Sequence, residues 1–144
     1  MKALIDTLAH LQRIRQKSVQ DKTVALAQQK QQCTRFDNNI KALGMLMQKT
    51  GVDFRETSAS ALKNVAGYKG SLQRVMNWQE EELALAHIKQ SHIQASLVTA
   101  ACQEKVVALT LDESRASRDA QQAVKQQKAS DDVAIQCWMR RLER

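Results

Sequence analysis

The sequence predicts an all-α fold in which two long helices pair as an elongated antiparallel coiled coil, a helical hairpin. Apolar residues recur with heptad spacing in single frames over most of the chain, which is typical of helices that pack against other helices. Alanine, glutamine, leucine and lysine, all good helix formers, dominate the composition. The chain has no proline, four glycines and 3% aromatic residues, and short β-branched runs between turn residues are absent. These observations favour helices with a thin core.

The longest heptad run predicts a helix over about 68–142. Its a and d positions are Leu72, Met76, Gln79, Leu83, Ala86, Gln90, Ile93, Leu97, Ala100, Glu104, Val107 and Leu111, then Ser114, Arg118, Gln121, Lys125, Lys128 and Asp132, then Ile135, Met139 and Leu142. The run is apolar at first, polar from Ser114 to Asp132, and apolar again at its end. A helix whose seam turns polar is expected to lose its partner there. We therefore expect an overhanging C-terminal helix of about thirty residues, roughly 40 Å long at 1.5 Å per residue.

A second heptad run predicts a first helix over about 2–50. Its a positions are Ile5, Gln12, Val19, Leu26, Cys33, Ile40 and Met47, and its d positions are Leu8, Arg15, Lys22, Gln29, Phe36, Leu43 and Thr50. Gly44 costs this helix about 1 kcal/mol relative to alanine, which a long helix tolerates. Gly51 follows the last heptad, and glycine commonly closes a helix C-terminus. The helix is expected to end there.

The heptad pattern lapses between the two runs, over about 51–67, and we expect the hairpin tip there as a short helix or loop. Thr57, Ser58 and Ser60 are residues that cap helices, and Ala59 to Ala66 can form one or two turns before Gly67 breaks them. The whole chain, 1–144, is then a single coiled-coil domain.

An antiparallel register in which residue numbers sum to 119 places a positions against d positions. It layers Met47 on Leu72, Leu43 on Met76, Ile40 on Gln79, Phe36 on Leu83, Cys33 on Ala86, Leu26 on Ile93, Val19 on Ala100 and Leu8 on Leu111. It also places Gln29 opposite Gln90 and Arg15 opposite Glu104. Buried polar pairs of this kind fix the register of coiled coils. Shifting by one heptad breaks both polar matches.

The charge of the chain favours acidic partners without identifying them. The 22 basic and 15 acidic residues give +7 at neutral pH, and the pI is near 9.6. Residues 1–22 carry five basic and two acidic groups, and residues 105–144 carry eight and six, so the open end of the hairpin is basic. Arg140, Arg141 and Arg144 beside Trp138 form a weak nucleic-acid footprint. The other two interpretations of this basic group are a solvated helix surface and a site for an acidic protein collar.

Motifs that carry chemistry are absent from the sequence. It has no Gly-rich phosphate loop, HExxH, CxxC or GxSxG. His87 and His92 are five residues apart, which is not the spacing that joins ligands on a helix face, and Glu80, Glu81 and Glu82 point in different directions around a helix. Three cysteines without a CxxC pair indicate reduced thiols in a cytosol, and the N-terminus resembles neither a signal peptide nor a membrane anchor. We predict a protein that is not an enzyme and needs no cofactor.

The sequence resembles the FliJ family of flagellar type III export over nearly its whole length. A helix of about fifty residues, a short connection, a longer helix and a basic C-terminus are similar to that family. Two local patterns carry the resemblance, namely residues 33–48, CTRFDNNIKALGMLMQ, and residues 68–75, YKGSLQRV, with Trp78 and Gln79 following.

The resemblance implies a cytoplasmic rod at the base of the flagellum, similar to the γ-subunit coiled coil of rotary ATPases. Its implied partners are the hexameric export ATPase (FliI), the export gate (FlhA) and export chaperones, with no stable nucleic acid, and its link to the membrane is peripheral and through these partners. By local alignment the gate contacts fall on Asn39, Leu43, Leu46, Thr50, Tyr68, Leu72, Val75 and Gln79. Leu46 and Thr50 depart from the aromatic residues expected there. The ATPase contacts are assigned to Ile135, Trp138, Met139, Arg140, Arg141 and Leu142.

Three alternatives stay open from the sequence. Stalk proteins of injectisome secretion systems share the same pattern. A basic coiled-coil rod that binds nucleic acid or lipid predicts a steep salt dependence of binding. A self-associating coiled coil predicts that the stripe from Ile135 to Leu142 packs on another copy of the chain.

Overall fold

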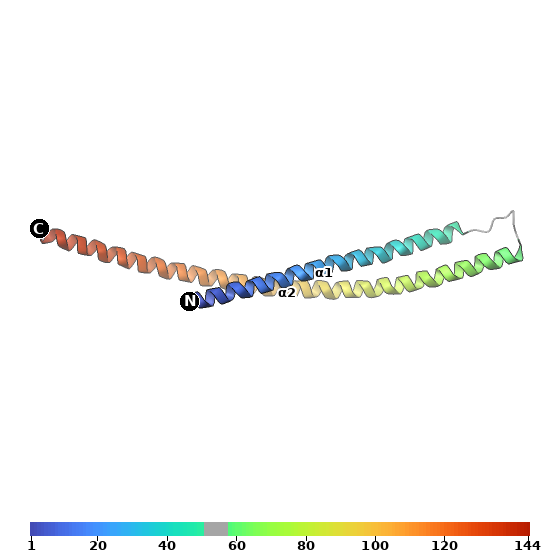
Figure 1. Ribbon diagram of the computed structural model, residues 1–144, viewed down its shortest axis with the longest axis horizontal. Coiled ribbons are helices and arrows are strands. Elements are labelled where there is room, and N and C mark those ends of the chain that lie inside the picture. The colour runs from blue at the N-terminus through green and yellow to red at the C-terminus, as the bar shows by residue number, and fades with distance from the viewer. Residues whose placement is uncertain (51–57) are drawn as a thin grey trace. The chain divides into compact units, whose positions relative to one another are not determined.

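The computed structural model describes residues 1–50 and 58–144, which form two α-helices and contain no strand (Figure 1). Helix α1 spans Lys2–Lys49, with 48 residues, and α2 spans Ala59–Leu142, with 84 residues. This all-helical arrangement, with two long helices packed against each other, confirms the predicted class. The middle of the expected tip, residues 51–57, lies outside the described residues, and so do the expected helix end at Gly51 and the cap residue Thr57.

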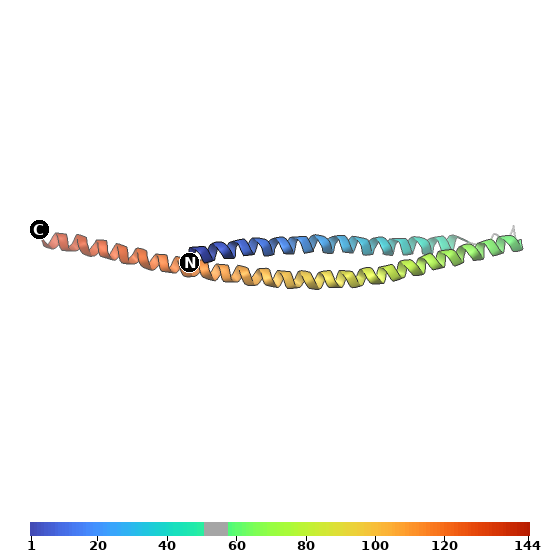
Figure 2. The same cartoon turned by 60° about the horizontal axis from the view of Figure 1, so that its bottom comes forward.

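The described chain divides into two compact units, and each contains a piece of both helices. One unit consists of 1–19 and 99–144, and the other of 20–98. Within each unit the α1 piece lies beside the α2 piece, as two views of the molecule agree (Figures 1 and 2). The prediction of a single domain is not tested by this division and stays a prediction.

The heptad positions form the contact between the helices. Every a and d position from Ile5 to Thr50 is buried or half-buried, and so is every one from Leu72 to Arg118. The positions between these seam residues are mostly exposed. From 119 to 144 every residue of α2 and its end is exposed, including all a and d positions. The frames read from the sequence are therefore the faces that pack.

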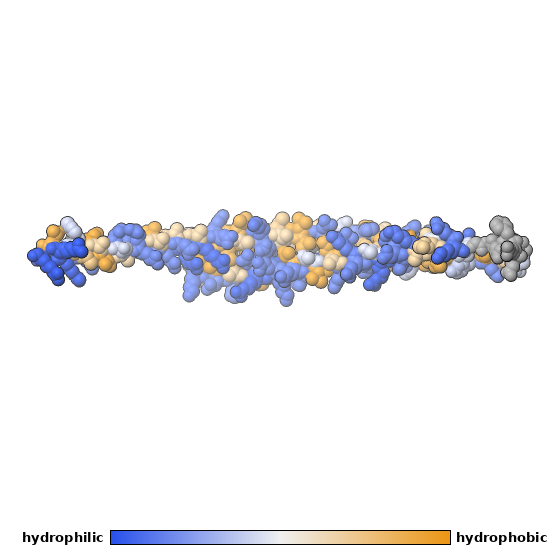
Figure 3. All heavy atoms as spheres, turned by 90° about the horizontal axis from the view of Figure 1, so that it is seen from above, coloured by the Kyte–Doolittle hydropathy of each residue, from blue (hydrophilic) through white to orange (hydrophobic). Residues whose placement is uncertain are grey.

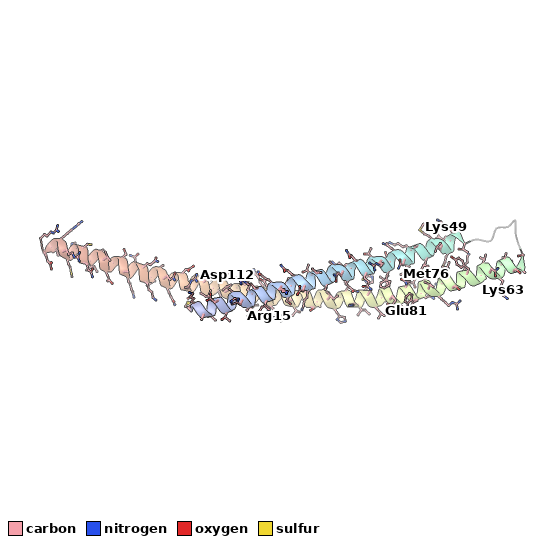
Figure 4. The ribbon with its side chains drawn as sticks, in the orientation of Figure 1. Arg15, Lys49, Lys63, Met76, Glu81 and Asp112 are labelled. Atoms are coloured by element: carbon pink, nitrogen blue, oxygen red, sulfur yellow. The ribbon has the colours of Figure 1, made fainter. Side chains whose placement is uncertain are left out.

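The unit of residues 20–98 shows the antiparallel register directly. Lys22 Nζ donates a hydrogen bond to Ser96 Oγ at 2.7 Å, and Gln29 Nε2 donates to the backbone oxygen of Ala86 at 3.0 Å. A methyl group built on Gly44 would lie 3.7 Å from Met76 Cε, and Met76 lies between the helices in Figure 4. In these contacts the residue numbers rise along α1 as they fall along α2, and the two residue numbers of each contact sum to a value near 119. The amide of Gln29 thus reaches a backbone group one turn from Gln90, the residue expected opposite it.

The unit of residues 1–19 and 99–144 is held by a small apolar core. Ile5, Ala100 and Leu111 are buried, and Leu111 is only 1% exposed. Arg15 does not pair with Glu104 as expected: its Nη1 donates to Gln103 Oε1 at 2.8 Å. The described residues contain no ion pair between Arg15 and Glu104. Because the arginine side chain is long, it extends beyond the seam, and its guanidinium group lies beside Gln103, which flanks the seam.

The second helix begins earlier than the heptad pattern indicates. We expected a break at Gly67 and a helix from about residue 68, but α2 is continuous from Ala59. Ser58 caps it, because its Oγ accepts a hydrogen bond from the backbone N–H of Ala61 at 3.1 Å. A glycine inside a helix costs only about 1 kcal/mol. Extending an existing helix through Gly67 is therefore cheaper than ending it and nucleating another.

Candidate protein-interaction surfaces

Five of the eight residues assigned to the export gate line one open groove between α1 and α2, here called the 39–79 groove. The groove has a volume of about 280 Å³, and its walls are Asn39, Ala42, Leu43, Leu46, Val75 and Gln79. The α1 members follow i, i+3, i+4, i+7 spacing, which places them on one helix face. Ala42 was not among the predicted residues, although this spacing from Asn39 includes it.

The other three assigned residues lie outside this groove. Tyr68 is 49% exposed on α2. Thr50 is half-buried, and its hydroxyl donates to the backbone oxygen of Leu46 at 2.6 Å. Leu72 is only 8% exposed and belongs to the seam. Leu72 therefore supports the hairpin, whereas Tyr68, Leu46 and Val75 present surface that a partner can reach.

Gln79 is a polar residue inside this groove with an unused hydrogen-bond acceptor. The residue is 9% exposed, and its Oε1 is buried without a hydrogen-bond partner. A buried carbonyl without a donor costs free energy, so a donor from a bound partner would be stabilised there. The heptad pattern indicates that Gln79 is buried, but it gives no signal that the amide oxygen is unpaired.

The C-terminal tail, residues 119–144, presents apolar side chains with no cover from the described chain. Ile135, Met139 and Leu142 occupy successive d, a and d positions and are 52%, 56% and 66% exposed, and Trp138 beside them is 61% exposed. Such a stripe is what a helix offers to another helix or to an apolar collar. Figure 3 shows hydrophobic and hydrophilic residues together at this end.

The three arginines of the tail gather near its end. Arg140, Arg141 and Arg144 line a shallow pocket of about 260 Å³ together with Cys137. Arg140 and Arg141 follow Cys137 at i+3 and i+4, which places these three residues on one side of α2, and Arg144 follows the end of the helix. Arg140 and Arg141 also lie in the last turn of α2, where positive charge is favourable beside the helix dipole. The tail therefore combines an apolar stripe with a cluster of guanidinium groups.

The groups considered for chemistry lie apart on the helix surfaces. His87 and His92 are exposed, Glu80 and Glu81 are exposed, and Glu82 is half-buried. In the described part of the chain no three histidine, cysteine or acidic residues gather to hold a metal ion. None of the described helices combines the length and the apolar character required to cross a membrane.

Seam, groove and tail together define a two-helix coiled-coil protein whose distinctive side chains face outward. The family model described as "Flagellar FliJ protein" matches residues 5–143, nearly the whole chain. The chain therefore belongs to the FliJ family, a component of flagellar type III export, as the local patterns on both helices predicted. No curated protein and no solved structure matches it.

Proposed function

We propose that this chain is a non-catalytic stalk of the flagellar type III export apparatus, in the cytoplasm at the base of the flagellum. It binds the hexameric export ATPase and links it to the export gate, and export chaperones are further partners. The match of the FliJ family model over residues 5–143 carries this proposal. Because that family is flagellar, it also favours a flagellar system over an injectisome.

The tail is the proposed ATPase contact. Met139 of its stripe and Trp138 beside the stripe are its largest apolar side chains, and each is more than half exposed. Large aromatic and apolar side chains that enter a partner's pocket dominate binding energy, and arginines add charge complementarity. Arg140 and Arg141 would face acidic groups of an ATPase collar.

The 39–79 groove and the exposed Tyr68 are the proposed gate contact. Leu46 and Val75 supply exposed apolar surface, at 45% and 44%, and Gln79 supplies a buried acceptor. A partner side chain that fills the groove and donates to Gln79 Oε1 would satisfy both features. Leu72 acts indirectly, by holding the two walls together.

A binding assay with the purified export ATPase tests the tail. The variant Trp138→Ala with Met139→Ala should lose affinity by at least about thirtyfold, since hot-spot residues are each worth 2 kcal/mol or more. The matched control is Val124→Ala with Val133→Ala, which removes tail side chains that are 55% and 59% exposed but are not among the assigned ATPase contacts. Equal binding by both variants would show that the stripe is not the contact.

The gate assignment needs a separate assay with the cytoplasmic part of the gate protein. Leu46→Asp with Val75→Asp should abolish gate binding and leave ATPase binding intact. Met45→Asp is the control, because Met45 is 57% exposed beside Leu46 and does not line the groove. Circular dichroism of each variant shows that helix content is kept. Gate binding by the double variant would place the contact elsewhere.

The Arg140, Arg141 and Arg144 cluster favours one rival function, the binding of a polyanion. That function predicts affinity for DNA with a logarithmic salt slope near 0.9 per phosphate neutralised. The stalk function predicts saturable binding to one ATPase hexamer. Titrating the chain with duplex DNA and with the ATPase at two salt concentrations separates the two.

A further inference from the structure

A second heptad stripe runs along α2 on the side opposite the seam, at the c and f positions. This outer stripe consists of Leu85, Ile88, His92, Ala95, Thr99, Cys102, Val106 and Leu109. None of its members is lysine, arginine, aspartate or glutamate. In a two-helix coiled coil these positions face solvent and are normally polar or charged. An apolar outer stripe over more than three heptads therefore indicates another packing surface.

The helix α1 does not cover this stripe. In the unit of residues 20–98, Leu85 and Ile88 are 60% and 55% exposed. In the unit that contains 99–144, Val106 and Leu109 are 63% and 51% exposed. Helix α2 is continuous through both units, so helical spacing alone places the members on one face.

The outer stripe is self-complementary when read in reverse. An antiparallel pairing in which residue numbers sum to 194 sets each c position against an f position. It layers Leu85 on Leu109, Ile88 on Val106, His92 on Cys102 and Ala95 on Thr99. The large apolar residues meet large apolar residues, and the small or polar ones meet at the centre. A surface that is complementary to itself is what a two-fold symmetric dimer requires.

The residues that flank the outer stripe agree with the same pairing. Flanking positions of an antiparallel pair meet like positions of the partner, so their numbers sum to 192 on one side of the stripe and to 196 on the other. On the first side Lys89 faces Gln103. On the second side Ser91 faces Lys105, and Val98, which is 58% exposed, meets its own symmetry mate. Lys89 and Lys105 lie on opposite sides, so no two like charges face one another over this length. Beyond it, Glu81 opposes Glu113, and this repulsion marks each end of the paired length.

We propose that the outer stripe is the interface of an antiparallel homodimer, in which the helix α2 of a second copy of this chain packs on it. The reversed symmetry of the stripe favours a second copy over an unrelated helix, which would need no such symmetry. The stripe shares no residue with the 39–79 groove or with the tail. The dimer is therefore independent of the proposed stalk function and can be tested without its partners.

Analytical ultracentrifugation of the full chain over a concentration series tests the dimer. Ile88→Glu sets a carboxylate against Val106 at two symmetric places and should weaken dimerisation by at least about tenfold. Ile14→Glu is the matched control, because Ile14 is 65% exposed on α1 and outside the stripe, and it should dimerise like the native chain. Ile88 is itself exposed, so the variant should keep its helix content. Native chain that stays monomeric at every soluble concentration would overturn the proposal, as would equal effects of the two variants.

Truncation after Asp132 distinguishes the outer stripe from the tail as the surface of self-association. The truncated chain should dimerise as the native chain does, because it retains every residue from Leu85 to Leu109. If truncation abolishes dimerisation, the tail stripe is the interface, and the proposal fails.

Disulfide trapping tests the register. In a Cys137→Ser chain, His92→Cys should form an intermolecular disulfide with Cys102 on oxidation, because a disulfide needs Cβ atoms within about 4.5 Å and the proposed register sets these two positions opposite one another. Gln94→Cys in the same background is the control, since residue 94 lies off the stripe. The native Cys33 is buried and does not compete. Equal trapping by both cysteine variants would rule out the proposed pairing.

A charge reversal at the end of the paired length is a further test of the register. Glu81→Lys should tighten the dimer on the order of two- to tenfold, because it replaces two repulsions between Glu81 and Glu113 with two ion pairs.

Discussion

Gln29 donates a hydrogen bond from Nε2 to the backbone carbonyl oxygen of Ala86 across the seam, at 3.0 Å and away from solvent. Both residues are buried, with 6% and 7% of their surface exposed. A carbonyl has two lone pairs, so this oxygen can accept from a side chain in addition to its own helix. A polar side chain bonded to the partner's backbone fixes where one helix stops sliding along the other, at some cost in stability.

Replacing this amide tests that cost. Gln29→Leu should raise the free energy of unfolding by about 1 kcal/mol, because burying a leucine contributes about 1.5 to 3 kcal/mol and the lost bond about 1 kcal/mol. Urea denaturation followed by circular dichroism measures it. Gln28→Leu, at an exposed position, should change the value by less than about 0.5 kcal/mol. A clear loss of stability in Gln29→Leu would mean that the hydrogen bond outweighs apolar burial at this site.

The contact between Arg15 and Gln103 predicts that a negative charge at position 103 would stabilise the hairpin. Gln103→Glu should place a carboxylate against the guanidinium and stabilise the hairpin by about 0.5 kcal/mol, as partly exposed ion pairs do. Arg15 Nε, which is buried without a partner, lies on the same guanidinium. The gain should vanish in an Arg15→Gln background. Thermal melts of the four chains form a double-mutant cycle, and simple additivity would contradict the contact.

Because α2 starts early, two of its glycines lie inside a helix, and replacing them with alanine should raise the stability of the chain. A Cβ added at Gly67 or Gly70 meets no atom within 4 Å, so Gly67→Ala and Gly70→Ala should each stabilise by about 1 kcal/mol. The reverse change Ala66→Gly, at an exposed position, should cost a similar amount. If Gly67→Ala destabilises the chain in thermal melts, the helix is broken there, as the heptad pattern first indicated.

The unpaired oxygen of Gln79 predicts opposite effects on stability and on binding. Gln79→Leu removes a buried acceptor without a donor and should stabilise the free chain by about 1 to 3 kcal/mol. The same variant should weaken gate binding if the partner supplies the missing donor. Unfolding curves and gate affinity are measured on one preparation. Reduced stability together with unchanged gate affinity would contradict both parts.

The backbone arrangement follows from the sequence because one periodic signal determines it. A seam needs an apolar residue every three or four positions, and burial from Ile5 to Thr50 and from Leu72 to Arg118 follows that spacing. The change to polar residues after Leu111 likewise anticipates the exposure of every residue from 119 onward. The antiparallel register was accessible because one alignment sets Gln29 opposite Gln90 and Arg15 opposite Glu104, and a shift by one heptad loses both matches.

The hydrogen-bond partners of side chains were less predictable, because a long side chain can reach several neighbouring residues. Arg15 has both Gln103 and Glu104 within one residue of its expected layer, and the seam pattern does not distinguish them. The beginning of α2 was missed because helix continuation through Gly67 depends on helix propensity, which is independent of the heptad. The 39–79 groove depends on the space left between side chains, which no periodicity describes.

The buried cysteine of the seam makes the chain a reporter of its own opening. Cys33 is 5% exposed at an a position of α1, whereas Cys102 and Cys137 are exposed. A thiol reagent should modify the two exposed sulfurs at once and Cys33 only when the helices separate locally. The delay of Cys33 modification relative to Cys102 and Cys137 therefore measures how often the seam opens locally. The dependence of this delay on the reagent concentration gives the free energy of that local opening.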